Sequence, residues 1–271
     1  MRIVVCVKEV LDPDAVNNYA LAGRLEIGED GKSLTQTTIP RLMNGFDEQA
    51  LEAALLLRDA GAECRIGVVS VGSDPTAILK HSAALGADEI ATIPLEEPAP
   101  DYHVVATLLA AYIGSIGETD LVLCGRQASD DDQAVVPALI CEALGIPLVT
   151  NARAIELTEA GGGSTIRVTR VTPDGDEVVE VSCPAVVTVS NELGEPRYPT
   201  AAKKLAARRM KPEIVSPEGL SLSAEALQPR VVAQRQFVPT VSGNCEMLGG
   251  ETPAELADAL IARLRQDSVI Q

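Results

Sequence analysis

The fold is decided by the stretch Leu121-Val-Leu-Cys-Gly-Arg-Gln-Ala-Ser-Asp-Asp-Asp-Gln-Ala-Val-Val136, in which an apolar strand ends at a glycine and opens through a polar turn into a helix. In α/β proteins such a turn holds a nucleotide phosphate, because the first N–H groups of a helix are unpaired and carry partial positive charge. Three consecutive aspartates, Asp130–Asp132, favour a simpler interpretation. They complement the helix dipole, and they would repel a phosphate placed among them. The stretch by itself leaves both nucleotide binding and helix capping open.

Strands and helices alternate on both sides of this stretch. Apolar runs predict buried strands over 2–8, 63–71 and 119–124, and helical periodicity predicts helices over 47–60, 74–85, 101–116 and 133–144. Asp74-Pro75 suits an N-cap followed by proline at the first helical position. Strands alternating with helices of this length form a mostly parallel sheet. We therefore predict a doubly wound α/β domain over 1–190, with neither GxGxxG nor a P-loop.

Four segments depart from this rhythm. Residues 18–39 predict a small hairpin or excursion, and 154–182 predict antiparallel hairpins around Gly161–Gly163 and Pro173-Asp-Gly175. A buried strand over 185–189 follows. The Pro-rich stretch 211–243 is weakly patterned and should lie across a neighbour, and Thr252-Pro-Ala-Glu255 is a capping box that opens a helix to about Gln266. We expect 189–211 to form a recognition loop with a basic helix, and 212–271 to form a C-terminal arm that packs on another subunit.

The charge of the chain is acidic overall but unevenly distributed. The net charge of −17 argues against non-specific binding to nucleic acid or to anionic lipid, and no apolar run approaches the length of a membrane span. Six of the 22 basic residues, however, lie within 197–211, which contains no acidic residue. A solvated helix face is one interpretation of this basic segment; a docking site for an acidic partner is the other.

No catalytic or metal-binding constellation is visible. The six cysteines are scattered singly, and neither His81 nor His103 has a Cys, Ser or Asp at catalytic spacing. The N-terminus lacks a leader pattern, so we expect a reduced, cytoplasmic setting. With six aromatic residues and no tryptophan, this chain alone cannot sandwich a flavin between rings. We expect a nucleotide-binding protein without its own catalytic residues.

A second candidate wall for a ligand is Met43-Asn-Gly-Phe-Asp47, ahead of the first long helix. Asn44 or Asp47 can cap that helix, which is all that the sequence demands. In a doubly wound sheet this turn and the strand ends at Cys6 and Val71 would border one crevice with residues 125–136.

A further stretch, Val186-Val-Thr-Val-Ser-Asn-Glu-Leu-Gly-Glu-Pro-Arg-Tyr-Pro-Thr200 followed by Lys203-Lys204, resembles the signature of the electron transfer flavoprotein β subunits. Residues 44–47 and 125–132 match that family in the same order. The resemblance implies a fold like that of the adenine nucleotide α-hydrolases. It also implies a heterodimer with an α subunit, FAD between the two, and an adenine nucleotide in the β subunit. That nucleotide is AMP in the housekeeping type and a second FAD in the electron-bifurcating type, and the sequence leaves the choice open.

The resemblance also implies where these molecules bind. The adenine-nucleotide site would comprise Cys6, Asn44, Gly45, Phe46, Asp47, Val71, Gly125, Arg126, Gln127, Ala128, Ser129, Asp130, Asp131, Asp132, Gln133, Ala134, Val135 and Val136. Apolar residues stand at 134–136 where the AMP type has polar ones, so a phosphate would rest on backbone N–H groups near the helix start at Gln133.

The partner-docking loop would comprise Glu195, Pro196, Arg197, Tyr198, Pro199, Thr200, Ala201, Lys203, Lys204, Arg208 and Arg209. Ala201 stands where some members carry an apolar anchor. The expected electron donors are acyl-CoA dehydrogenase-type flavoenzymes of fatty acid oxidation, and the acceptor is the quinone oxidoreductase of this system or a similar protein. Two rival interpretations are a bifurcating β subunit with a second FAD, and a non-redox adenine-nucleotide binder of the universal stress type.

Overall fold

The computed structural model describes residues 1–35, 38–96, 101–160, 163–238 and 245–270. The chain divides into two compact units, Met1–Gln236 and Phe237–Gln271. The segment 189–236 therefore belongs to the first unit.

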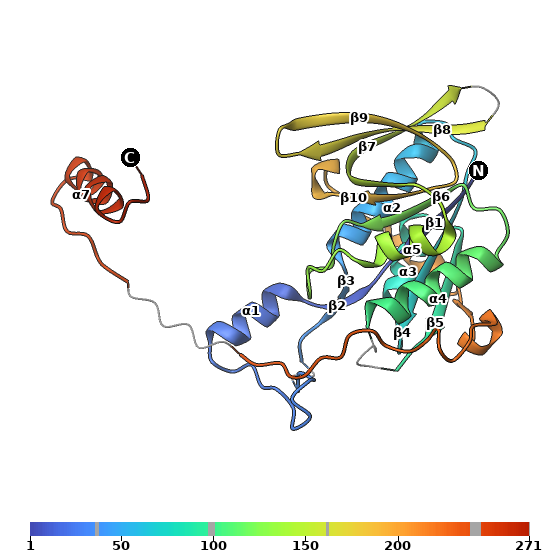
Figure 1. Cartoon of the computed structure of the whole chain (residues 1–271), viewed down its shortest axis with the longest axis horizontal. Helices are drawn as coiled ribbons and strands as arrows, with labels where there is room; N and C mark the ends of the chain where they lie inside the picture. Colours follow the sequence, from blue (N-terminus) through green and yellow to red (C-terminus); the bar gives the residue numbers. More distant parts are fainter. Residues whose placement is uncertain (36–37, 97–100, 161–162, 239–244, 271) are drawn as a thin grey trace. The chain divides into compact units, whose positions relative to one another are not determined.

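A nine-stranded sheet forms the centre of the first unit (Figure 1). Its order is β11-β5-β4-β1-β6-β10-β7-β8-β9, parallel as far as β7 and antiparallel from β7 to β9. The strands are β1 (Arg2–Cys6), β4 (Arg65–Gly72), β5 (Glu89–Pro94), β6 (Leu121–Gly125), β7 (Leu148–Ala160), β8 (Gly163–Thr172), β9 (Gly175–Ser182), β10 (Ala185–Val189) and β11 (Glu213–Ile214). The predicted mostly parallel sheet with antiparallel hairpins is confirmed.

Helices cover both faces of the sheet, because successive strand residues point to opposite sides. Ile3 and Val5 of β1 join the core cluster of α2 (Gly45–Asp59) and α3 (Thr76–Leu85). Val4 and Cys6 join the cluster of α4 (Tyr102–Ser115) and α5 (Val136–Leu144) on the other face. This is the predicted doubly wound architecture.

Three helix starts differ from the prediction by two residues or more, and the first of them is α2, which begins at Gly45 rather than Asp47. Helix α5 begins at Val136, not Gln133, because Asp132 and Ala134 have φ of 51° and 55° and cannot belong to a right-handed helix. Helix α3 begins at Thr76; Pro75 takes the N-cap position, and Asp74 accepts a hydrogen bond from the Thr76 N–H.

The N-terminal excursion contains a helix that sequence reasoning missed, α1 (Pro13–Leu21). Asp12 caps it, so Asp12-Pro13 carries the same start signal that was used at Asp74-Pro75. Strands β2 (Glu9–Leu11) and β3 (Arg41–Met43) pair on either side of the excursion, and a bridge joins Ile27 to Leu34.

The hairpins follow β7. Thr172 pairs with Gly175 across the turn at Pro173-Asp174, and Gly175 has a φ of 126° that suits glycine. The turn predicted at Gly161–Gly163 falls partly on residues 161–162, which lie outside the described residues.

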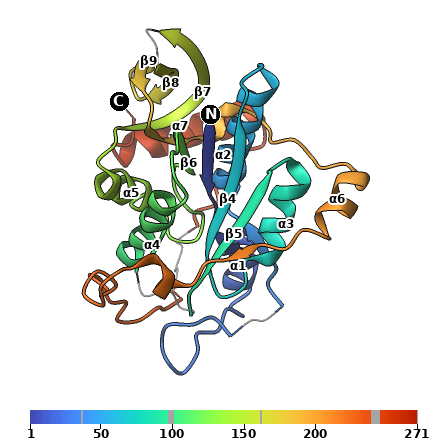
Figure 2. The same ribbon diagram turned by 90° about the vertical axis from the view of Figure 1, so that its right-hand side faces the viewer.

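The segment after β10 stays on the first unit (Figure 2). It contains η1 (Asn191–Leu193), α6 (Ala201–Ala207), β11 and η2 (Pro217–Leu220). Leu220, Leu222 and Leu227 pack against the core that contains α4, and the carboxylate of Asp101 accepts hydrogen bonds from the Arg230 and Val231 N–H groups. Residues 212–236 thus cover this chain itself, which differs from the expectation that all of 212–271 forms an arm on another subunit.

Within its described residues, 237–238 and 245–270, the second unit contains one helix, α7 (Pro253–Gln266). The Thr252 hydroxyl accepts a hydrogen bond from the Glu255 N–H, so the predicted helix start and end are confirmed. Leu256, Leu260 and Ile261 on this helix are all more than 40% exposed.

Candidate functional site

A cavity of about 850 Å³ lies at the carboxyl ends of β1 and β6. These neighbouring strands mark the point where the order of the sheet reverses, since β4 and β5 follow on one side and β10 and β7 on the other. Open α/β sheets bind ligands at this switch point, because the loops that leave it diverge to opposite faces. Fold topology and cavity position therefore point to the same place.

Most of the predicted nucleotide residues line this cavity. They are Cys6, Asn44, Asp47, Val71, Gly125, Gln127, Ala128, Asp130, Asp131, Gln133, Ala134, Val135 and Val136. The other five, Gly45, Phe46, Arg126, Ser129 and Asp132, do not line it.

Sequence reasoning missed several residues of the wall. Lys8, Glu9 and Arg41 stand near the end of β1 and on β2 and β3, and Tyr102, Val105 and Leu109 line the cavity from α4. Lys32–Leu34 and Gln236 complete one side. Of these residues, only Lys8 could have been predicted from the sequence, because it stands at the end of a predicted strand that borders the switch point.

Asn44 and Asp47 connect the start of α2 to the strand ends. The Asn44 amide donates to the Gln127 carbonyl at 2.8 Å and accepts from the Ser129 N–H at 3.2 Å. The Asp47 carboxylate accepts from the Lys8 N–H at 2.7 Å and from the Gly125 N–H at 3.0 Å. Asn44 occupies the N-cap position of α2 without a side-chain capping bond, so its predicted capping role is replaced by a bond across the cavity wall.

Asp47 is a buried carboxyl group. Burial raises the pKa of Asp47 to about 7, although hydrogen bonds from Lys8, Asn44 and Gly125 oppose that change. A pKa near 7 means that the protonated and the ionised forms of Asp47 are both populated at neutral pH.

Lys8 pairs with two of the three aspartates. Its ammonium lies 2.8 Å from Asp130 and 3.2 Å from Asp131. Burial disfavours the charged form of Lys8, but the hydrogen bonds and charges of the two carboxylates outweigh burial and raise its pKa. Asp131 also accepts from the Gln133 N–H at 3.2 Å. The aspartates thus do not cap α5, whose start has no side-chain cap, and Lys8 offsets part of their charge beside the cavity.

Gly125 is required by packing inside the protein. A Cβ atom there would lie 2.5 Å from the Asp47 carboxylate and 2.7 Å from Phe46. The glycine therefore admits the first turn of α2 onto the end of β6.

Two thiols line the same cavity, because Cys6 of β1 pairs in register with Cys124 of β6. A hydrogen bond with Cys6, together with burial, raises the pKa of Cys124. Both cysteines are free and buried.

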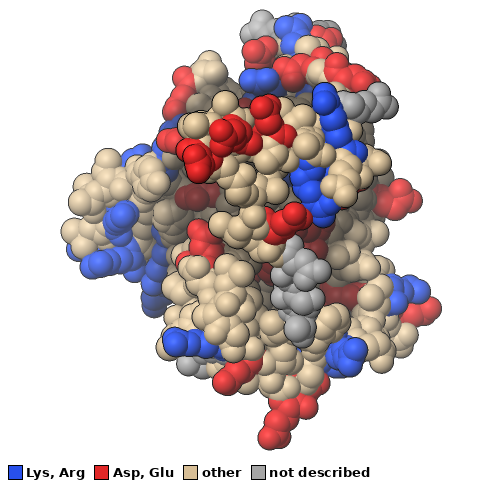
Figure 3. All heavy atoms as spheres, turned by 90° about the vertical axis from the view of Figure 1, so that its left-hand side faces the viewer, with Lys and Arg blue, Asp and Glu red and all other residues tan. Residues whose placement is uncertain are grey.

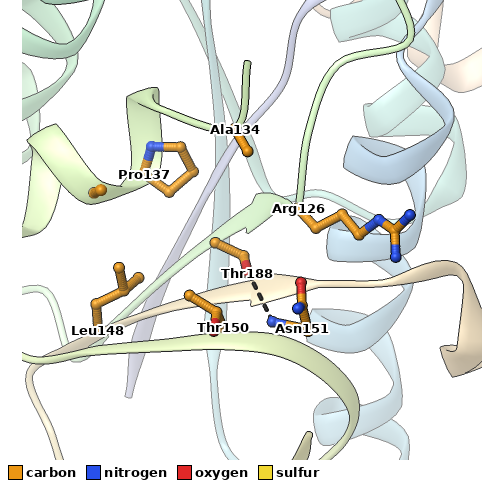
Figure 4. A pocket seen from close by; sticks show the side chains of 8 residues that line it. Arg126, Ala134, Pro137, Leu148, Thr150, Asn151 and Thr188 are labelled. Atoms are coloured by element: carbon orange, nitrogen blue, oxygen red, sulfur yellow. Dashed lines mark hydrogen bonds between the residues drawn. The ribbon is translucent and has the colours of Figure 1, made fainter. Parts of the chain in front are cut away.

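A second cavity of about 250 Å³ lies on the other side of the 126–136 loop (Figure 4). Arg126 lines it, but the guanidinium runs away from Ala134 and Pro137 and lies 5.0 Å from the centre of the Phe46 ring. Arg126 and Phe46 therefore form a cation–π pair instead of contacting the main cavity.

The predicted docking loop carries its charge on α6. The blue side chains at the left margin of Figure 3 lie over this helix, with no acidic side chain among them. Arg197 is different, because its guanidinium binds Glu52 and Asp59 of α2. It is thus paired within the chain and adds little to the docking charge.

The described residues include no cluster of three or more His, Cys, Asp or Glu that could hold a metal ion. Among the helices in the same ranges, none has both the length and the apolar character needed to cross a membrane.

Comparisons with known proteins agree with this geometry. The family model of the electron transfer flavoprotein domain matches residues 33–217. The chain is 32% identical to the caffeyl-CoA reductase-Etf complex subunit CarD of Acetobacterium woodii over the full length of both. It is 30% identical to the acryloyl-CoA reductase electron transfer subunit gamma of Anaerotignum propionicum, again over both whole chains. It is also 33% identical to the electron transfer flavoprotein subunit beta of Megasphaera elsdenii, over 84% of this chain and 82% of that protein. The chain belongs to the electron transfer flavoprotein β-subunit family.

Proposed function

We propose that this chain pairs with an α subunit, shares an interface FAD with it, and carries electrons between a flavoenzyme acting on CoA thioesters and a quinone reductase or another acceptor. Family membership supports the carrier role, and the names of the two full-length relatives, both subunits of CoA-thioester reductase systems, support a partner flavoenzyme that acts on CoA thioesters. FAD, when bound, supplies the redox chemistry, and this chain supplies binding, orientation and docking. The six free cysteines support a reducing compartment such as the cytoplasm.

We further propose that the main cavity holds an adenine nucleotide. The observation that carries this proposal is the uncapped start of α5 at the switch point of the sheet, where Ala134, Val135 and Val136 line the wall. Unpaired N–H groups at a helix start bind phosphate, and Lys8 reduces the repulsion from the neighbouring aspartates.

The size of the cavity favours a second FAD over AMP. A volume of about 850 Å³ is near the upper end of small-molecule sites, and AMP is only one of the two halves of FAD. The wall beyond the phosphate region is apolar where Val105 and Leu109 of α4 line it. An apolar wall of this kind is better covered by the ring system of a flavin than exposed to water. Bound AMP is the alternative outcome of the experiment.

The remaining segments are assigned to partners. We propose that residues 189–211 dock the electron-donating flavoenzyme and that α7 packs on the α subunit. Exposed apolar side chains on α7, Leu256, Leu260 and Ile261, would be covered there.

Acid extraction of the co-expressed α/β complex, followed by chromatography, tests the cofactor assignment. We expect two FAD per heterodimer; one FAD with one AMP would show the mononucleotide type. One FAD without any other adenine compound would overturn the cavity assignment.

Two matched variants locate the nucleotide in the cavity. Val136→Asp places a carboxylate at the first position of α5, where it favours the helix dipole but competes with phosphate, so we expect the complex to lose one nucleotide. Ser129→Asp lies on the same loop outside the cavity and should retain it.

A further inference from the structure

The chain between η2 and the second unit crosses one side of the main cavity. Residues 230–236 run from the start of α4 to the N-terminal excursion, as the orange-red trace in Figure 1 shows. Asp101 lines the cavity at one end of this segment, and Gln236 and Lys32 line it at the other. We call residues 230–236 the strap, because they join two walls of the cavity that are far apart in the sequence.

Asp101 holds the first end of the strap. One carboxylate oxygen, Oδ1, accepts a hydrogen bond from the Val104 N–H at 2.9 Å and thereby caps α4. The other, Oδ2, accepts from the N–H groups of Arg230 at 2.6 Å and Val231 at 2.9 Å. Burial raises the pKa of Asp101, but these hydrogen bonds outweigh burial, so that the pKa lies below its usual value. The carboxylate is therefore charged, and its hydrogen bonds are of the stronger, charge-assisted kind.

The excursion holds the other end of the strap. The Gln236 N–H donates to the Gly31 carbonyl at 2.6 Å. Beside this bond, a Cβ atom added to Gly31 would lie 3.9 Å from the Cβ of Arg235. Backbone N–H groups of the strap thus fix it at both ends, to α4 and to the excursion.

Little buried surface supports the strap between these two ends. All of residues 231–236 are exposed, and the apolar residues Val231 and Val232 are 46% and 62% exposed. A segment with few buried contacts opens locally at a small cost in free energy. The strap is therefore able to detach while the sheet and the helices of the first unit stay folded.

We propose that the strap closes the main cavity with Asp101 as its latch, and that detachment of the strap is the step through which the nucleotide enters and leaves. Detachment frees the excursion wall, which carries Lys32, from the α4 wall, which carries Tyr102. Opening of a covering segment commonly limits the rate at which a ligand is released. Asp101 acts here as a positioning residue, through the strap. This inference rests on the proposed nucleotide in the cavity.

Nucleotide exchange in the purified α/β complex tests the proposal. The complex is mixed with an excess of FAD or AMP that carries a radiolabel in the adenine ring, and the label bound after gel filtration is followed over time. The FAD at the subunit interface exchanges as well, so two phases are expected. The phase that is missing in Val136→Asp belongs to the cavity, and the interface phase is the internal control.

Replacement of Asp101 by serine separates its two roles. A serine hydroxyl also caps helices, so Asp101→Ser keeps the bond to Val104, but its single oxygen cannot hold the strap as well. We expect the cavity phase to become roughly tenfold faster, because two charge-assisted hydrogen bonds are lost. Asp74→Ser makes the same replacement at the start of α3, where the side chain does not line the cavity, and should leave the rate unchanged.

A disulfide between the strap and the excursion tests closure directly. The 3.9 Å between the Cβ positions of residues 31 and 235 is within the range that disulfides span. In Gly31→Cys/Arg235→Cys, oxidised glutathione takes up the two electrons and two protons as the bond forms. The cavity phase should then slow by more than about tenfold and recover when dithiothreitol reduces the disulfide. Arg235→Cys alone should not respond to the oxidant.

The outcomes separate the inference from the proposed function. A wild-type cavity rate in Asp101→Ser would overturn the latch, and a wild-type rate in the oxidised double variant would overturn closure by the strap; the nucleotide assignment survives both. The double variant keeps the test available if Asp101→Ser is unstable. If the wild-type complex has no phase that Val136→Asp removes, the cavity holds no nucleotide, and the proposed assignment falls together with the inference.

Discussion

Replacement of Gly125 by alanine should destabilise the first unit even when no nucleotide is present. The new Cβ would lie 2.5 Å from the Asp47 carboxylate and 2.7 Å from two atoms of Phe46. Ordinary contacts to a Cβ begin near 3.4 Å, so the first turn of α2 must move away from β6 by most of an ångström.

Two costs arise from this movement. Overpacking of a close-packed interior costs about 1–3 kcal/mol. Lengthening the 3.0 Å hydrogen bond from the Gly125 N–H leaves a buried donor poorly paired, which costs about 1–3 kcal/mol more. We expect a total of about 2–6 kcal/mol, which corresponds to a fall in Tm on the order of 10 °C for a unit of this size.

The assay is thermal unfolding followed by circular dichroism, with and without added FAD. Gly45→Ala is the matched control, because Gly45 lies in the neighbouring turn and has no atom within 4 Å of an added Cβ. That variant should lose no stability and could gain up to about 1 kcal/mol, since alanine favours the helix. If Gly125→Ala melts with the wild type without FAD and merely loses nucleotide, the glycine serves the ligand and the packing argument is wrong.

Three further predictions concern charge and the C-terminal unit. Because the pKa of Asp47 is raised to about 7, its contribution to stability is complete below about pH 4 and is lost as the pH rises through 7. In urea titrations, the free energy of unfolding of the wild type minus that of Asp47→Asn should therefore decrease over that pH range. An increase of this difference with pH would contradict the prediction. Replacement of Arg208 and Arg209 by glutamate should slow reduction of the flavin by the partner dehydrogenase and weaken the salt dependence of that rate, at unchanged flavin content. If the variant and the wild type have equal stopped-flow rates at each of two ionic strengths, the basic residues form only a solvated helix face. Truncation after Gln236 should leave the melting of the first unit unchanged but weaken assembly with the α subunit, as measured by light scattering, whereas a lower melting temperature would show that the second unit supports the first.

The sequence by itself determined the fold. The continuous apolar runs of β1 and β6 and the helical periodicity of α2 and α4 are local properties. An unbroken apolar run indicates a strand buried on both faces, and the helical period indicates which face of a helix is buried. Parallel strands that are joined by helices allow few sheet topologies, so the pattern also indicated a crevice at the strand ends. In the structure this crevice lies at the switch point between β1 and β6. The end of α7 was equally predictable, because its capping residues are neighbours in the chain.

The tertiary structure alone decided which charged side chains meet. Lys8 is 122 residues from Asp130, and Arg197 is 145 residues from Glu52. No local pattern encodes contacts at such separations, so the aspartates resembled a helix cap and Arg197 resembled part of the docking charge. The packing role of Gly125 also depends on the tertiary structure, because the atoms that exclude a side chain there belong to another helix, 78 residues earlier in the case of Asp47. A pattern of residue types shows where a side chain faces, whereas the partner it finds depends on how distant elements pack.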